Sequence, residues 1–283
     1  MPPPSTILQG KNNTIMTYSH ALIHPVTLSL PELPQAAQGL RVAHLTDIHI
    51  SKPSRDQDEL LNLIATLEVD LFLLTGDYMS LPGDELAAIP FMHRLSEVMK
   101  PRIGSFGVFG NHDLPTLRHQ LQDLPIHWLN NQAHLLPEIG VEIAGMETLQ
   151  QVWPDSLALL EHRASLQPSN NSQRFLRLLL CHHPTYLPVA SDLKFDVMLS
   201  GHTHGGQCRL PGKKPLINST DYPMHLTSGI LRQRKTLGLV SRGLGEVHLP
   251  IRAFCPPQLP IYSFQQGPLP GEDTDHICNT QPW

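Results

Sequence analysis

The sequence predicts an α/β fold in which two packed β-sheets are flanked by helices. In the first part of the chain, short apolar runs typical of buried strands alternate with segments of helical periodicity. Beyond residue 201, apolar runs recur without strong helical patterns between them, so this part is rich in strands. The chain has 283 residues, of which 40% are hydrophobic, and can therefore bury a sizeable core.

The first part of the chain is expected to alternate strands and helices. The expected strands are residues 40–45, 70–75 and 103–109, and the expected helices are residues 58–68 and 86–99. In the first helix, leucine and isoleucine recur at helical spacing at positions 60, 61, 64 and 67. Pro101 follows the second expected helix. Proline commonly stands just beyond a helix end, so Pro101 supports an end near residue 99. The short apolar run 70–75 is typical of a strand buried on both faces.

The remainder of the chain is expected to form one helix and several strands. They are the helix 156–166 and the strands 141–146, 175–181, 195–199, 226–230, 237–241 and 259–264. We expect a single domain over residues 40–266, because no convincing linker divides it. Residues 1–39 carry scattered prolines and weak periodicity, which favours an irregular lead-in or an edge hairpin. Residues 267–283 are polar, with prolines and glycines, and are expected to form a disordered tail.

The composition argues against several classes of protein. The chain has 20 Lys and Arg residues against 25 Asp and Glu residues, and the net charge of −5 argues against duplex nucleic acid as a partner. It holds no apolar run long enough to cross a bilayer, and its first residues lack the pattern of a signal peptide. The 4 cysteines form no C-x-x-C pair and are expected to be reduced. We therefore expect a cytoplasmic protein, with peripheral contact at the inner face of the membrane left open.

Five short polar segments each follow the carboxyl end of an expected strand, where ligands gather in α/β sheets. They are Thr46-Asp47-Ile48-His49, Thr75-Gly76-Asp77, Phe109-Gly110-Asn111-His112-Asp113, Leu180-Cys181-His182-His183-Pro184 and Ser200-Gly201-His202-Thr203-His204-Gly205-Gly206. Each segment alone is a weak signal, since a Gly-Asp pair commonly makes a turn and a lone histidine often caps or packs. Together they supply carboxylates, imidazoles and an amide oxygen. Such a mixed nitrogen and oxygen set suits manganese, iron or zinc.

These segments contain the motifs D-x-H, G-D, G-N-H-[DE], H and G-H-x-H in that order, from Asp47 to His204. In this the sequence resembles the calcineurin-like metallophosphoesterase superfamily, which implies a four-layer α/β/β/α sandwich. A finer resemblance follows in four later segments, Gly205-Gly206-Gln207, Arg209-Leu210-Pro211-Gly212, Ser241-Arg242-Gly243-Leu244-Gly245 and Cys255-Pro256-Pro257. They resemble a branch of small bacterial phosphodiesterases, some of which act at membranes or on lipid-linked pyrophosphates.

The resemblance implies two adjacent metal ions, either divalent or of mixed valence, and assigns their ligands. The implied ligands are Asp47, His49 and His204 for one ion, Asn111, His182 and His202 for the other, and Asp77 as a bridge between both. A bridging ligand needs two oxygens, and among these side chains only a carboxylate has two. Both His182 and His183 could supply the fourth-motif ligand; the family pattern favours His182, and His183 stays open as a neighbour near the rim.

The resemblance also implies a catalytic residue. His112 would stand over the phosphate and assist the leaving group, and Asp113 could orient it. The implied enzyme is a metal-dependent phosphoesterase that uses a metal-activated hydroxide on a phosphodiester or pyrophosphate bond of a small-molecule or lipid-linked substrate. A protein phosphatase is less favoured, because the chain carries no obvious regulatory extension. The alternatives are a metal-binding scaffold, or a peripheral membrane protein of the same fold, without significant catalysis.

Overall fold

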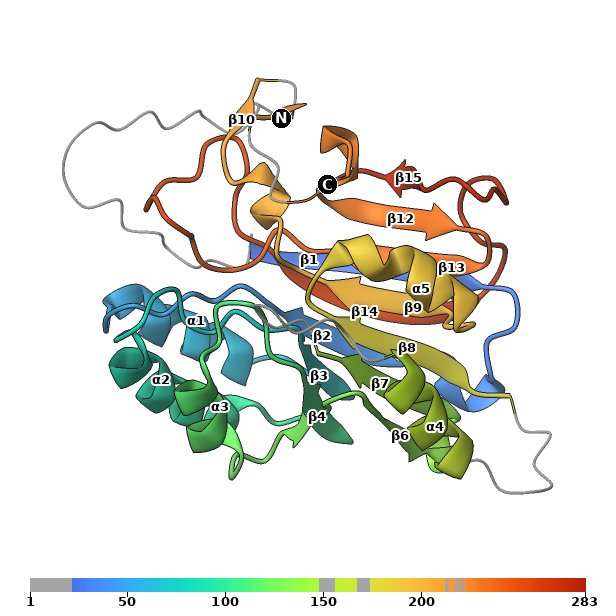
Figure 1. The fold of residues 1–283 in the computed structure, drawn as a ribbon, viewed down its shortest axis with the longest axis horizontal. Helices are drawn as coiled ribbons and strands as arrows, with labels where there is room; N and C mark the ends of the chain where they lie inside the picture. The colour runs from blue at the N-terminus through green and yellow to red at the C-terminus, as the bar shows by residue number, and fades with distance from the viewer. Residues whose placement is uncertain (1–21, 148–155, 167–173, 212–213, 217–219, 221) are drawn as a thin grey trace.

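Two mixed β-sheets form the centre of the molecule, and helices flank them, as the sequence predicts (Figure 1). The computed structural model describes residues 22–147, 156–166, 174–211, 214–216, 220 and 222–283. One apolar cluster joins inward side chains of both sheets, among them Phe106 of the first and Leu178 of the second. Two further clusters lie on the outer faces, under the helices. The layers therefore follow the order helix, sheet, sheet, helix.

The first sheet has six strands in the order β1-β14-β2-β3-β4-β5. Their bounds are β1 Ile23–Leu30, β14 Leu259–Gln266, β2 Arg41–Leu45, β3 Leu71–Leu74, β4 Gly104–Gly107 and β5 His127–Trp128. Neighbouring strands are parallel except for the pair β14 and β2. The carboxyl ends of β2, β3 and β4 therefore meet at one edge of the sheet.

The second sheet has seven strands in the order β15-β12-β13-β9-β8-β7-β6. Their bounds are β6 Gln132–Leu136, β7 Val141–Met146, β8 Leu176–Cys181, β9 Val197–Ser200, β12 Gly229–Gln233, β13 Thr236–Val240 and β15 Cys278–Gln281. The strands β7, β8, β9 and β13 are parallel to their neighbours in that group, so their carboxyl ends also share an edge. A separate two-stranded ribbon pairs β10 Arg209–Leu210 with β11 Lys214–Pro215.

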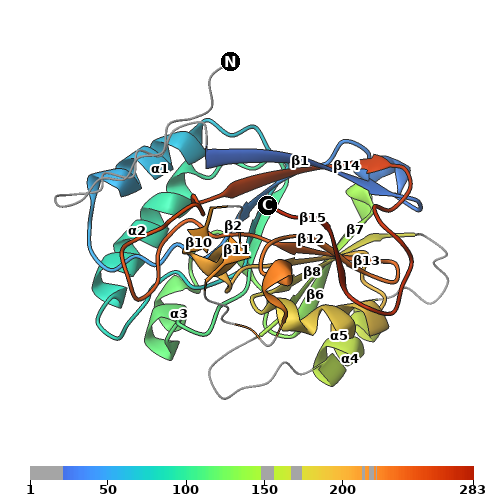
Figure 2. The same ribbon diagram turned by 90° about the horizontal axis from the view of Figure 1, so that it is seen from above.

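In the part of the chain that the structure describes, five α-helices cover the sheets. They are α1 Arg55–Ala65, α2 Glu85–Val98, α3 Pro115–Leu121, α4 Ser156–Leu166 and α5 Leu187–Asp192. Short 3-10 turns lie at Gln35–Ala37, Pro137–Ile139, Pro184–Tyr186, His204–Gly206 and Met224–Leu226. Figure 2 shows α1, α2 and α3 together on one side and α4 and α5 on another. Within the described residues, no helix is both long and apolar enough to cross a lipid bilayer.

Most of the predicted strands and all three predicted helices are present, with ends shifted by a few residues. The expected strand 226–230 begins later, because residues Met224–Leu226 form a 3-10 turn before β12. The hydrophobic pattern does not predict α3, α5, β5, β6, β10 or β11, because each is too short to show a clear hydrophobic period. For residues 1–39 the sequence predicts an irregular lead-in or an edge hairpin; the described part, residues 22–39, is not irregular throughout, because it contains β1. Strand β1 does lie at a sheet edge, but its partner is β14, in parallel; residues 1–21 lie outside the described residues.

The prediction of a disordered tail over residues 267–283 is wrong. Strand β15 pairs antiparallel with β12, so the sheet satisfies backbone groups that a polar tail would otherwise expose to water. The side chain of Trp283 is only 5% exposed and stacks near Tyr262. The Trp283 carbonyl oxygen accepts hydrogen bonds from Arg209 and from the Ser228 hydroxyl. Tertiary pairing, rather than local hydrophobicity, therefore orders this segment.

Trp283→Ala should lower the free energy of unfolding by about 3 kcal/mol, because it leaves a cavity where a buried aromatic ring now packs. Urea denaturation of the purified protein measures this change. Leu86→Ala is the control, since that side chain is 83% exposed and should alter stability little. Equal stability of the two variants would mean that the tail does not contribute to the core.

Candidate metal centre

The five polar segments of the sequence meet where the strands of both sheets end. The loops after β2 and β3 are joined by backbone hydrogen bonds, from Asp47 to Gly76 and from His49 to Asp77. The loops of the second sheet reach the same place: the amide of His202 donates to both carboxylate oxygens of Asp47, at 2.9 and 3.1 Å. The structure therefore brings the predicted site residues of the two sheets together.

Asp47, His49 and His204 form the first group of donors. The Nε2 atoms of His49 and His204 lie 3.1 Å apart, and His204 Nε2 lies 3.4 Å from Asp47 Oδ1. All three side chains are buried, and one donor atom from each lies within 4.8 Å of the others. Two imidazole nitrogens and a carboxylate oxygen at this spacing can hold one metal ion.

Asp77 lies between this group and His182. Its Oδ2 atom is 2.9 Å from His182 Nε2 and 3.8 Å from His49 Nε2. The other oxygen, Oδ1, accepts the backbone amide of His112 at 2.9 Å. One carboxylate oxygen thus faces histidines that the sequence assigned to different ions, while the other fixes the loop that carries His112.

His182, His183 and His202 form another group of possible donors. His182 Nδ1 contacts the Thr75 carbonyl oxygen at 2.6 Å, so Nδ1 carries the proton and Nε2 offers its lone pair to the site. The rings of His183 and His202 stack with centroids 3.7 Å apart. The amide oxygen of Asn111 lies 3.1 Å from His183 Nε2. His183 therefore lies closer to the cluster than a rim residue would, and it remains an alternative to His182.

The backbone at the cluster adopts a conformation that side chains rarely allow. Five of the seven predicted ligands have a positive φ: Asp47 (50°), His49 (51°), Asp77 (57°), His202 (69°) and His204 (51°). Residues other than glycine avoid this left-handed region, and their concentration in one place is typical of functional sites. The fold therefore maintains a strained backbone in order to aim these side chains at one another.

Asp113 does not orient His112, contrary to the sequence interpretation. Its carboxylate accepts the backbone amides of Asp77, Tyr78 and Gly110 at 2.7–2.8 Å, and so holds the loops after β3 and β4 together.

Ser80, rather than Asp113, contacts the ring of His112, and it also contacts the ring of His49. Its carbonyl oxygen lies 2.7 Å from His112 Nδ1, and its hydroxyl lies 3.0 Å from His49 Nδ1. Sequence reasoning missed Ser80, because a lone serine three residues after Asp77 carries no signal of its own.

The charges in this cluster favour a bound cation. Burial, with a smaller contribution from the charge of Asp77, raises the pKa of Asp47 to about 6 and that of Asp113 to about 7. Burial also opposes ionisation of Asp77, yet the adjacent His182 holds the pKa of Asp77 below its usual range. Within the described residues, the buried Nε2 of His182 makes no aligned hydrogen bond despite its short distance to Asp77. Buried carboxylates beside an unsatisfied imidazole nitrogen fit a divalent metal.

Ser80→Ala should weaken metal binding or activity by roughly ten- to a hundredfold, because partners that orient a ligating histidine typically contribute that much. The alanine keeps the carbonyl contact to His112 and removes only the hydroxyl contact to His49. Metal titration of the purified variant measures the loss. Ser80→Thr, which retains a hydroxyl, should restore most of it; unchanged affinity in Ser80→Ala would exclude the positioning role.

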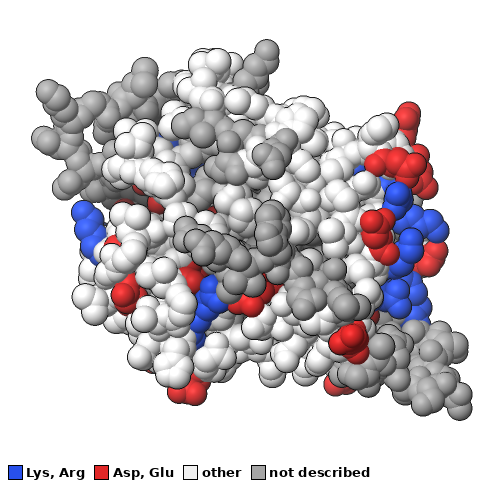
Figure 3. Space-filling model, viewed as in Figure 1, with Lys and Arg blue, Asp and Glu red and all other residues white. Residues whose placement is uncertain are grey.

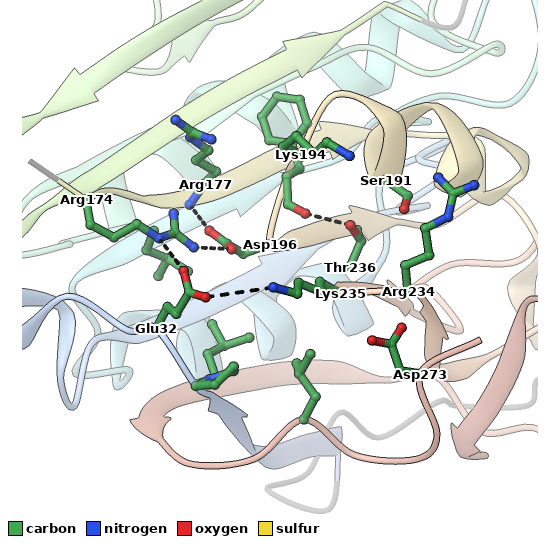
Figure 4. A pocket seen from close by; sticks show the side chains of 15 residues that line it. Glu32, Arg174, Arg177, Ser191, Lys194, Asp196, Arg234, Lys235, Thr236 and Asp273 are labelled. Carbon is green, nitrogen blue, oxygen red and sulfur yellow. Dashed lines mark hydrogen bonds and ion pairs between the residues drawn. The ribbon is translucent and has the colours of Figure 1, made fainter. Parts of the chain in front are cut away.

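A cavity of about 580 Å³ lies at the other ends of the strands, beside the starts of β8 and β13 (Figure 4). Its charged side chains largely pair with one another: Arg174 contacts Asp196 and Glu32, and Lys235 also faces Glu32. Figure 3 shows such mixed Lys, Arg, Asp and Glu side chains gathered at one edge of the molecule. Ion pairs between its lining residues stabilise the walls of this cavity, which is separate from the metal cluster. A second cavity, of about 520 Å³, adjoins His49.

A family model described as calcineurin-like phosphoesterase matches residues 40–206, which include all seven predicted ligands and His112. The chain belongs to the calcineurin-like phosphoesterase family. Members of this family are hydrolases that act on phosphoesters with divalent metals, and the Asp and His clusters supply a plausible metal site.

Relatives within the family include small bacterial proteins, as the later motifs predicted. YkuE of Bacillus subtilis, an uncharacterized metallophosphoesterase, is 27% identical over 86% of this chain and 84% of its own. The phosphodiesterase YaeI of Escherichia coli is 30% identical over 62% of this chain and 64% of its own. The UDP-2,3-diacylglucosamine pyrophosphatase LpxG of Chlamydia muridarum is 23% identical over 82% of this chain and 85% of its own.

Proposed function

We propose that this chain is a two-metal phosphoesterase that hydrolyses a phosphodiester or pyrophosphate bond. The observation that carries the proposal is the place of Asp77, whose Oδ2 faces His49 on one side and His182 on the other. The proposed ligands are Asp47, His49 and His204 for one ion, Asn111, His182 and His202 for the other, and Asp77 for both. The relative YaeI is named a phosphodiesterase and the relative LpxG a pyrophosphatase, which supports these two bond types.

Two ions of manganese, iron or zinc would, when bound, neutralise phosphate oxygens and lower the pKa of the attacking water. The protein's own contribution is to position the proton donor. His112 Nδ1 donates to the Ser80 carbonyl, so any proton that His112 transfers belongs to Nε2. The His112 backbone amide is tied to Asp77 Oδ1, which keeps the ring beside the metal cluster. His112 is therefore placed to protonate the leaving oxygen.

A metal-binding scaffold without catalysis is the alternative, and a loading experiment separates the two. The protein is stripped with a chelator, reloaded with manganese, iron or zinc, and assayed on bis(p-nitrophenyl) phosphate. Hydrolysis that depends on added metal supports the phosphoesterase. Comparison with p-nitrophenyl phosphate tests the preference for diesters over monoesters. Two bound metals with no hydrolysis of either compound would favour the scaffold.

A further inference from the structure

A cavity of about 520 Å³ adjoins the metal cluster at His49, and its size is within the range of small-molecule sites. Three segments line it: residues 48–57 before and at the start of α1, residues 80–84 before α2, and residues 245–250. The first two segments belong to loops that also carry or contact the proposed ligands. The cavity therefore adjoins the cluster at which the proposed phosphate site lies.

His112 lies beside both the metal cluster and residues that line this cavity. Its ring centroid is 5.3 Å from that of His49 and 6.2 Å from that of His248, and both of these histidines line the cavity. Its Nδ1 contacts the carbonyl of Ser80, another lining residue. If His112 protonates the leaving oxygen of a phosphate bound at the metals, the group attached to that oxygen extends into the cavity.

The walls of the cavity carry more negative than positive charge. Its lining includes the carboxylates of Asp56, Asp84 and Glu246, with Lys52 as the one Lys or Arg among the described lining residues. The Asp84 carboxylate accepts hydrogen bonds from the backbone amides of Ser80 and Leu81, so its role is to stabilise the loop before α2. Ser51, Ser54 and Ser80 also line the space.

Glu246 is the carboxylate most available to a ligand. It is partly buried, and within the described residues no hydrogen bond is formed to its carboxylate. Burial raises the pKa of Glu246 and the charge of Asp56 raises it further, although Arg252 acts in the opposite direction. The Arg252 guanidinium is engaged by backbone carbonyls, among them those of Arg242 and Gly245. Two carboxylates facing one cavity favour a hydrogen-bond donor or a cation between them.

We propose that this cavity binds the alcohol half of a phosphodiester, and that this alcohol is rich in hydroxyls or positively charged. The inference rests on the proposed function and narrows it to diesters. Water attacks phosphorus and releases a proton to solvent, the bond between phosphorus and the alcohol oxygen breaks, and that oxygen keeps the electron pair and takes a proton from His112 Nε2, which solvent then restores. The products are a phosphomonoester and the free alcohol. A second phosphate, as in a pyrophosphate, would lie against Glu246 and Asp56 and be repelled.

Three substrates test the proposal on the metal-loaded full chain: glycerophosphocholine, glycerophosphoglycerol and UDP-glucose. We expect kcat/KM to be higher for the two diesters than for the pyrophosphate. Glu246→Lys should lower the ratio of the choline diester to UDP-glucose by about tenfold or more, because it reverses the charge at the wall. Glu246→Gln should shift the ratio in the same direction by less, without adding a bulky cation.

Asp123→Lys is the matched control, because it makes the same charge change at an exposed position between α3 and β5. Equilibrium binding of the three compounds to metal-loaded His112→Ala gives a second readout, which does not require turnover. An unchanged ratio in Glu246→Lys, or binding that favours UDP-glucose, would overturn the proposal. A parent protein that cannot hydrolyse bis(p-nitrophenyl) phosphate would refute the proposed function, while the binding comparison would still decide which group the cavity accepts.

Discussion

Asp77→Asn should deplete both metal ions and lower phosphodiesterase activity by roughly a thousandfold. The substitution removes one negative charge and leaves a single oxygen, where the carboxylate now faces His182 at 2.9 Å and His49 at 3.8 Å. Metal ions supply several kcal/mol of charge stabilisation in such reactions, and about 4 kcal/mol corresponds to a thousandfold change in rate. The loss should affect both ions, because Asp77 is the ligand that we propose both ions share.

The fold should survive this change. Asparagine tolerates the positive φ of 57° at this position better than most residues, and its oxygen can still accept the His112 amide. Elemental analysis of the purified variant measures bound metal, and thermal denaturation in the presence of a chelator compares the folds without metal. Asp123→Asn is the control at an exposed position. Two retained metals with normal activity would remove Asp77 from the bridge.

The arrangement of the cluster could be anticipated because its residues follow parallel strands. Asp47, Asp77 and Asn111 come just after β2, β3 and β4, and parallel neighbours end at a common edge. His182 and His202 follow β8 and β9 of the other sheet in the same way. The order of the motifs along the chain therefore carries spatial information, since each strand delivers one segment to the same edge.

Orientation within a loop could not be anticipated in this way. Asp113 is next to His112 in sequence, but its carboxylate turns back to accept three backbone amides of the adjoining loops. The partner of the His112 ring is the Ser80 carbonyl, a backbone group that every residue type offers. Sequence spacing specifies which residues are near, whereas the direction of each side chain depends on loop geometry.

Pairing between distant segments was also beyond the sequence analysis. Strand β1 near one end of the chain pairs with β14, so that Ile23 lies opposite Leu259. Strand β15 pairs with β12 although its own residues are mostly polar. Local periodicity shows only how a segment buries its own apolar face: β1 buries Val26, Leu28 and Leu30 without indicating which strand it pairs with, and β15 has little apolar face.

His112→Ala should keep both metal ions and lower kcat by about a hundredfold or more, the usual contribution of an acid-base or charge-stabilising group. The His112 ring hydrogen-bonds to the Ser80 carbonyl rather than to a predicted ligand, and its backbone amide contact to Asp77 does not depend on the side chain. His202→Ala is the contrasting variant, because it removes a proposed ligand and should lose metal as well as activity. His93→Ala, at an exposed position on α2, is the control for histidine removal as such.

The leaving group then separates proton donation from charge stabilisation in His112→Ala. A nitrophenolate leaves without a proton, whereas an alkyl alkoxide needs one, so the variant should be slowed most on diesters with poor leaving groups. The measurement is the ratio of kcat for alkyl and nitrophenyl diesters in the parent and in the variant, together with bound metal by elemental analysis. Loss of a metal ion would make His112 a ligand. Equal slowing for both leaving groups would leave His112 as a charge-stabilising group, because a general acid must matter more where the departing oxygen is more basic.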